Sequence, residues 1–145
     1  MPDIAAGELF ASLGLKQRAR RGSSWLDLFE RVESGLPIMS LDQVTGRVAP
    51  DDTGLKYRIV PKATLSRRTA ERKLSSDESA RLVRLAKAWT LAREVWGDDT
   101  AARRFLYEPH MLLQQRRPID LVLANEIGAT LVTDILGRLR YGSAA

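Results

Sequence analysis

Residues 52–78 constrain the fold of this chain more strongly than any other stretch. The dipeptide Val60-Pro61 divides them, and a proline suits the first turn of a helix because its φ angle is fixed and its missing N–H costs nothing there. Before it, Leu55 and Ile59 keep helical spacing. The stretch therefore predicts two short helices joined by a tight connection.

The same stretch is the most basic part of the sequence. Two short helices around a turn, with basic and hydroxyl residues opening the second, are typical of a helix that enters the major groove of DNA. If Leu65 is the buried anchor of the second helix, the residues that project away from the core are Lys62, Ala63, Ser66 and Arg67. Thr64 then lies at the margin. The alternative is a charged helix face that only meets solvent. The basic residues are Lys56, Arg58, Lys62, Arg67, Arg68, Arg72 and Lys73, against the single acid Glu71.

Two more helices precede this stretch. One runs from Ser24, with Asp27 in its first turn, and stops at Gly35. The other ends at Val48 after apolar residues at helical spacing. We expect Asp51 or Asp52 to cap the short helix that follows.

The sequence after residue 74 predicts an apolar helical module. Ser75 and Glu78 form a capping box that opens the longest helix, which runs to Trp96. Later helices are capped by the pair Asp98-Asp99 and by Asn125. The apolar stripe of the long helix is a core face or a partner surface, and it consists of Leu82, Leu85, Ala86, Trp89, Ala92 and Trp96.

We therefore expect an all-α chain in two parts. A helix-turn-helix bundle covers residues 24–74, and a C-terminal helical domain covers residues 75–145. Residues 1–23 are expected to form a basic flexible arm. This arm is either a disordered tail or a segment whose Lys and Arg side chains contact phosphates.

The residues argue against catalysis. The chain has no cysteine, and its one histidine, His110, lacks the spacing of a metal site or a catalytic triad. Glycines are scattered, so no loop for cradling phosphates is evident. We expect no enzyme activity and neither a cofactor nor a metal.

Charge and hydropathy bound the partners and the compartment. A net charge of +5 and a pI of about 10.0 favour an anionic partner or serve only solubility. No apolar run approaches the roughly 20 residues that cross a bilayer, so no membrane partner is expected. Basic residues near the N-terminus follow the apolar ones, which is opposite to a secretory signal, and the lack of cysteine suits the cytoplasm.

Residues 60–68, Val-Pro-Lys-Ala-Thr-Leu-Ser-Arg-Arg, resemble the turn and recognition helix of Xre-type (Cro/repressor-like) regulators. The segments that follow resemble, in order and spacing, the toxin-binding domain of the Xre/MbcA/ParS antitoxins. The resemblance covers most of the chain, from about residue 36 to residue 142. The C-terminal segments are residues 74–87, 92–97, 118–121, 125–129 and 136–142.

The resemblance implies the antitoxin of a type II toxin–antitoxin pair. The partner it implies is a RES-domain toxin that consumes NAD, with the end of the antitoxin covering the NAD pocket of the toxin. It also implies that the N-terminal part binds promoter DNA of its own operon as a homodimer. The implied DNA-binding residues are Lys62, Thr64, Ser66, Arg67 and Arg68. The implied toxin-binding residues are Arg138, Leu139, Arg140, Tyr141 and Gly142.

The chain departs from the family pattern at several positions. Ile59 replaces a glycine of the turn, Pro61 replaces a serine cap, and Arg140 stands where an acid is frequent. A different reading is a dimeric DNA-binding transcriptional regulator whose C-terminal half serves only for dimerisation.

Overall fold

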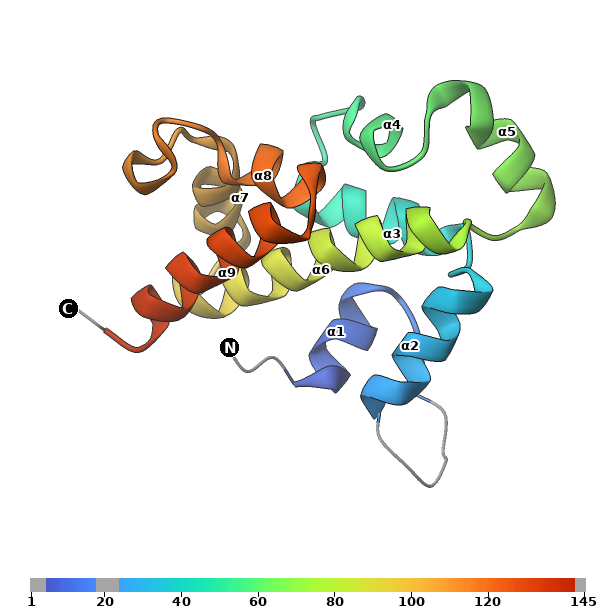
Figure 1. Ribbon diagram of the computed structural model, residues 1–145, viewed down its shortest axis with the longest axis horizontal. Coiled ribbons are helices and arrows are strands. Elements are labelled where there is room, and N and C mark those ends of the chain that lie inside the picture. The colour runs from blue at the N-terminus through green and yellow to red at the C-terminus, as the bar shows by residue number, and fades with distance from the viewer. Residues whose placement is uncertain (1–4, 18–23, 143–145) are drawn as a thin grey trace. The chain divides into compact units, whose positions relative to one another are not determined.

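The computed structural model describes residues 5–17 and 24–142, and within these ranges the chain forms helices and no strands (Figure 1). The all-α prediction is confirmed. The chain divides into two compact units, with the boundary between Val83 and Arg84. The expected domain boundary, between residues 74 and 75, lies just before the long helix α6 (Ser76–Trp96), which extends across the boundary between the two units.

The N-terminal unit contains five helices and the start of α6. Neighbouring helices α1 and α2 pack together, as do α3 and α4. The helices are α1 (Ala6–Ser12), α2 (Ser24–Ser34), α3 (Met39–Val48), α4 (Leu55–Ile59) and α5 (Lys62–Glu71). Its buried apolar side chains are Leu9, Phe10, Leu13, Leu28, Leu36, Leu41, Val44, Val48, Leu55, Ile59, Val60, Leu74 and Leu82.

Part of the expected flexible arm is a packed helix. In and just after α1, Leu9, Phe10 and Leu13 are buried. The hydroxyl of Ser40 donates a hydrogen bond to the carbonyl of Leu13 (2.7 Å), and the guanidinium of Arg31 lies 5.3 Å from the centre of the Phe10 ring. The apolar residues of the arm thus find a core within this unit. Its most basic residues, Arg18, Arg20 and Arg21, lie outside the described residues.

A close backbone contact fixes the segment between α2 and α3 against the segment after α5. The N–H of Leu74 donates to the carbonyl of Leu36 (2.8 Å), and the N–H of Ile38 donates to the carbonyl of Arg72 (3.1 Å). Gly35 has a φ of +97°, and a Cβ atom there would collide with the carbonyl oxygen of Leu74. Glycine is therefore required where these two segments meet.

The C-terminal unit contains the rest of α6 and the helices that follow. Helices α7 (Asp99–Tyr107) and α8 (Pro118–Ala124) pack together, and α8 packs on α9 (Glu126–Arg140). A Cβ atom at Gly128 would collide with the carbonyl of Leu121, so glycine permits the close approach of α8 and α9. A short 3₁₀ helix, η1 (Met111–Leu113), follows α7.

Most of the predicted helix caps are confirmed. Asp98 accepts a hydrogen bond from the N–H of Ala101 (2.8 Å), and Asn125 accepts one from the N–H of Gly128 (2.9 Å). The prediction that Asp51 or Asp52 caps α4 is wrong. Gly54 takes the cap position, because Asp52 instead accepts from the N–H of Gly54 (3.1 Å) and closes the turn before the helix.

Within residues 5–17 and 24–142, no helix combines the length and the hydropathy needed to cross a membrane.

Candidate functional site

Helices α4 and α5 form the predicted pair of short helices around a tight connection (Figure 1). Val60 is extended and buried, and Pro61 takes the N-cap position of α5. The carbonyl of Pro61 accepts hydrogen bonds from the N–H groups of Thr64 (2.8 Å) and Leu65 (3.1 Å). Because the proline ring offers no hydrogen-bonding group, the first turn of α5 begins without a side-chain cap.

The predicted DNA-binding residues of α5 fall into two groups. Lys62 and Ser66 are exposed, and the Arg67 side chain is 66% exposed. Thr64 is half-buried. Arg68, in contrast, has a side chain only 15% exposed. Lys62, Ser66 and Arg67 therefore face solvent, whereas Arg68 faces the protein. Thr64 lies between the two groups.

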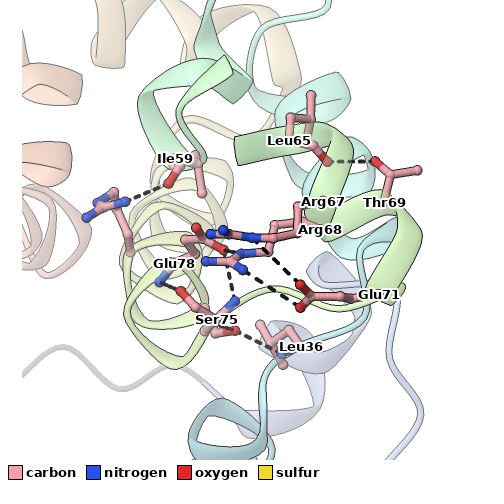
Figure 2. A network of polar contacts seen from close by, with 11 residues as sticks. Leu36, Ile59, Leu65, Arg67, Arg68, Thr69, Glu71, Ser75 and Glu78 are labelled. Atoms are coloured by element: carbon pink, nitrogen blue, oxygen red, sulfur yellow. Dashed lines mark hydrogen bonds and ion pairs between the residues drawn. The ribbon is translucent and has the colours of Figure 1, made fainter. Parts of the chain in front are cut away.

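Arg68 is held by the capping box of α6, as Figure 2 shows. Its Nε donates to Oε1 of Glu78 at 2.7 Å. The same Oε1 accepts from the N–H of Ser75 (2.9 Å), while the N–H of Glu78 donates to the hydroxyl of Ser75 (3.1 Å). The predicted capping box is therefore confirmed, and its carboxylate also binds a residue of α5.

This environment shifts the pKa of both partners. Burial of the Glu78 carboxyl raises its pKa, but hydrogen bonds from Arg68 and Ser75 and the positive charge of Arg68 outweigh burial and hold the pKa below its ordinary value. The hydrogen bond to Glu78 raises the pKa of Arg68, which burial opposes. The pair is thus ionised on both sides at neutral pH.

Sequence reasoning missed an aromatic residue beside the exposed basic group. The ring of Tyr57, in α4, lies 5.5 Å from Nζ of Lys56 and 5.6 Å from Nζ of Lys62. Both distances suit cation–π contacts, which orient the two ammonium groups. The only signal in the sequence was an aromatic residue flanked by lysines at positions 56 and 62.

The predicted toxin-binding residues lie at the end of α9. Arg138 is exposed, Leu139 is 45% exposed and Tyr141 is 66% exposed. Arg140 binds Glu94 of α6 (2.6 Å), and its guanidinium lies 5.5 Å from the centre of the Tyr141 ring. Gly142 has a φ of +62°, which ends the helix in a left-handed turn. Arg140 is therefore tied to the unit, while Tyr141 and Leu139 are presented to solvent.

Leu139 also lines an apolar groove of about 310 Å³. Within it, the ring centres of Trp96 and Phe105 lie 6.2 Å apart. The ring of His110 packs edge-on against that of Phe105, with 5.8 Å between the two ring centres. The Nδ1 of His110 accepts from the N–H of Leu112 (3.1 Å), so the lone histidine caps the N-terminus of η1. The spacing of apolar residues predicted Trp96 in the stripe of α6, but nothing in the sequence indicated this groove.

Among the described residues, His, Asp and Glu side chains do not gather in groups of three or more that could hold a metal ion.

Comparisons with known proteins match both units. Residues 27–87 match the antitoxin Xre-like helix-turn-helix domain, and residues 91–142 match the antitoxin Xre/MbcA/ParS C-terminal toxin-binding domain. The chain is also similar to Antitoxin Xre of Yersinia enterocolitica, with 28% identity over 144 residues that span 97% of this chain and 93% of that protein. The chain therefore belongs to the Xre/MbcA/ParS antitoxin family, with an Xre-like helix-turn-helix domain followed by a toxin-binding domain.

Proposed function

We propose that the chain neutralises a RES-domain toxin of a type II pair by covering the NAD pocket of the toxin with the end of α9. We further propose that it binds promoter DNA of its own operon as a homodimer through α5 and thereby represses transcription. Residues 24–74 would supply the DNA contacts and residues 75–145 the toxin contacts.

The exposed end of α9 is the observation that carries the toxin-binding proposal. Tyr141 and Leu139 leave large apolar areas in solvent beside the groove lined by Trp96 and Phe105. Tyrosine and arginine at a helix end, next to an apolar hollow, are typical of residues that dominate protein interfaces. The ion pair of Arg140 with Glu94 holds this end in place before binding, which lowers the entropy lost on association.

The exposed face of α5 supports the DNA-binding proposal. Lys62 and Arg67 reach solvent from successive turns, and Ser66 between them leaves room for a close approach. Such residues gain affinity by releasing counterions from phosphates, and arginine can also read a guanine edge. We expect promoter affinity to fall steeply as salt concentration rises.

Co-expression with the adjacent reading frame of the operon tests the toxin-binding proposal. We expect the neighbour alone to stop growth and lower cellular NAD, and the chain to restore both in a complex that co-purifies. Deleting residues 139–145 should abolish protection and leave promoter binding intact. A harmless neighbour, or one that does not associate with the chain, would refute neutralisation.

The second candidate is a dimeric transcriptional regulator whose C-terminal half only dimerises. The observation in its favour is that Ile127 and Leu131 of α9 are exposed one turn apart. Under this alternative, deleting residues 139–145 changes little, while Arg67→Ala combined with Arg68→Ala removes the phenotype. The two deletion outcomes separate the candidates.

A further inference from the structure

We propose that Arg68 is a positioning residue, which sets the orientation of the recognition helix α5 through Glu78 and does not itself contact DNA. The proposal rests on the promoter binding proposed above. It reassigns one of the five residues that the family resemblance implies for DNA contact. It also gives Glu78 a role in DNA binding, although this residue falls within the C-terminal domain expected from the sequence (residues 75–145).

The two adjacent arginines of α5 differ in what holds them. The side chain of Arg68 is 15% exposed and lies 2.7 Å from a carboxylate whose own side chain is 8% exposed. Arg67 is 66% exposed and has only the longer contact with Glu71, at 3.7 Å, which Arg68 also makes at that distance. A phosphate that recruited Arg68 would have to break a short, shielded ion pair and leave Glu78 buried without its partner. Such a rupture is costly, because the desolvation of the carboxylate is then uncompensated.

The start of α6 anchors three other segments as well as capping its own helix (Figure 2). Glu78 binds α5 through Arg68, and Nη1 of Arg81 donates to the carbonyl of Ile59, the last residue of α4 (2.6 Å). The hydroxyl of Ser79 accepts from the N–H of Leu36 (2.8 Å) and donates to the carbonyl of Ser75 (2.7 Å). Both helices of the DNA-binding pair are therefore tied to about one turn of α6, between Glu78 and Arg81.

Helix α5 needs such an anchor because apolar packing fixes it weakly. Every residue of α5 is half-buried or exposed, including Leu65, the apolar residue considered above as a possible buried anchor. Its N-cap is Pro61, and its C-cap is Arg72 in a left-handed conformation (φ +61°). With little apolar area buried, the shielded ion pair to Glu78 supplies a directional contact that fixes the rotation of α5 about its axis.

The test is the affinity of the full chain for promoter DNA after Glu78→Gln. The amide of glutamine preserves the capping box, since Gln serves at this position as well as Glu, but it removes the charge that holds Arg68. We expect affinity to fall by roughly five- to tenfold, because the uncharged amide oxygen accepts a weaker hydrogen bond from Arg68 than the carboxylate does. If Arg68 contacted DNA, the same substitution would release it and remove a negative charge, so affinity would hold or rise.

Three matched variants sharpen the result. Asp77→Asn removes the same charge from the adjacent, exposed position of α6, and we expect it not to weaken binding. Arg68→Gln should weaken binding at least as much as Glu78→Gln, because it removes the short contact with Glu78 and also the longer one with Glu71 (3.7 Å). The double variant should bind no more weakly than Arg68→Gln alone, because the contact with Glu78 is already lost in that variant. The logarithm of the binding constant falls as the logarithm of salt concentration rises, and each phosphate contact adds about 0.9 to the magnitude of this negative slope. Arg67→Gln should therefore reduce that magnitude by about 0.9, whereas Arg68→Gln should leave it unchanged.

An NMR signal reports the contact directly in the folded wild-type chain. The Nε–Hε resonance of Arg68 should keep its position when DNA is added, while that of Arg67 moves. Three outcomes would each overturn the proposal. One is an Arg68 signal that moves when DNA is added, and another is a shallower salt dependence for Arg68→Gln. The third is a folded Glu78→Gln variant that binds DNA as tightly as the wild type. Should Glu78→Gln not fold, Arg68→Lys keeps the charge but loses the Nε donor, and unweakened binding by it would overturn the proposal too. If the wild-type chain does not bind the promoter, the proposed DNA-binding function fails instead.

Discussion

At the scale of single residues, the Glu78 carboxylate accepts hydrogen bonds from both its own helix cap and a neighbouring helix. Its Oε1 accepts from the N–H of Ser75 and from Nε of Arg68. Both donors favour the charged carboxylate, which is why its pKa is lowered although burial opposes this. Protonating Glu78 would weaken the cap and release α5 together.

This environment predicts how stability depends on pH. The pKa of Glu78 is lower in the folded chain than in the unfolded chain, so its charge stabilises the fold above the ordinary glutamate pKa of about 4.3. That contribution is lost as pH falls through the lower, folded pKa. We expect urea unfolding to show the wild type more stable than Glu78→Gln at neutral pH, with the difference shrinking as the pH falls below the ordinary glutamate pKa. A difference that is independent of pH would contradict the role of the charge.

A residue of the C-terminal unit tests toxin binding. Tyr141 is exposed and follows the last residue of α9, so its removal costs the fold little. We expect Tyr141→Ala to weaken the complex with the toxin by about 2 kcal/mol or more, the loss typical of a central interface tyrosine. Calorimetric titration of purified toxin measures this. Leu26→Ala, which trims an exposed apolar residue of α2, serves as the control and should leave toxin affinity unchanged.

At the scale of elements, sequence patterns predicted the helices well because most helix boundaries are set by interactions between residues close together in the sequence. The capping box at Ser75 and the caps at Asp98 and Asn125 act over three residues, and the structure confirms them. What the sequence could not predict depends on contacts between distant segments. The pairing of Arg68 with Glu78 joins two helices, and the groove beside Leu139 requires α6, α7 and α9 to meet.

The same distinction applies to α1 and to the assigned DNA-binding residues. Residues 1–23 were predicted to form a flexible arm because the sequence does not show what their short apolar cluster packs against. In the structure, the ring of Phe10 packs against the guanidinium of Arg31 in α2. Likewise, Arg67 and Arg68 are the same residue type at adjacent positions, so the sequence alone does not distinguish their roles. Their neighbours separate them, since one side chain is 66% exposed and the other 15%.

The connection between α2 and α3 gives a prediction at this scale. Gly35→Ala places a Cβ atom against the carbonyl of Leu74 in a left-handed backbone conformation, so it should destabilise the chain by at least about 2 kcal/mol. Gly46→Ala is the control, because Gly46 lies within α3 with open space around it. That variant should stabilise the chain by about 0.5–1 kcal/mol. Thermal unfolding measures both, and equal effects would contradict the role of the close contact.

At the scale of the whole molecule, one helix contributes to both units. The start of α6 anchors α5 through Glu78 and α4 through Arg81. Beyond the unit boundary, Arg84 donates to the carbonyls of Val122 (3.1 Å) and Leu123 (3.3 Å) in α8. Each unit is therefore completed by a different part of a continuous helix, which makes the independence of the two units a question for experiment.

A substitution at the close approach of α8 and α9 addresses that independence. Gly128→Ala forces a Cβ atom against the carbonyl of Leu121, and we expect it to destabilise the C-terminal unit by about 1–3 kcal/mol. Because the contacts that anchor α5 lie entirely within the N-terminal unit, promoter affinity should persist at temperatures where toxin binding is already lost. Hydrogen exchange should likewise rise in α8 and α9 but not in α3. If promoter binding and toxin binding instead fail together, the two units unfold as one, and α6 transmits the loss of packing from one to the other.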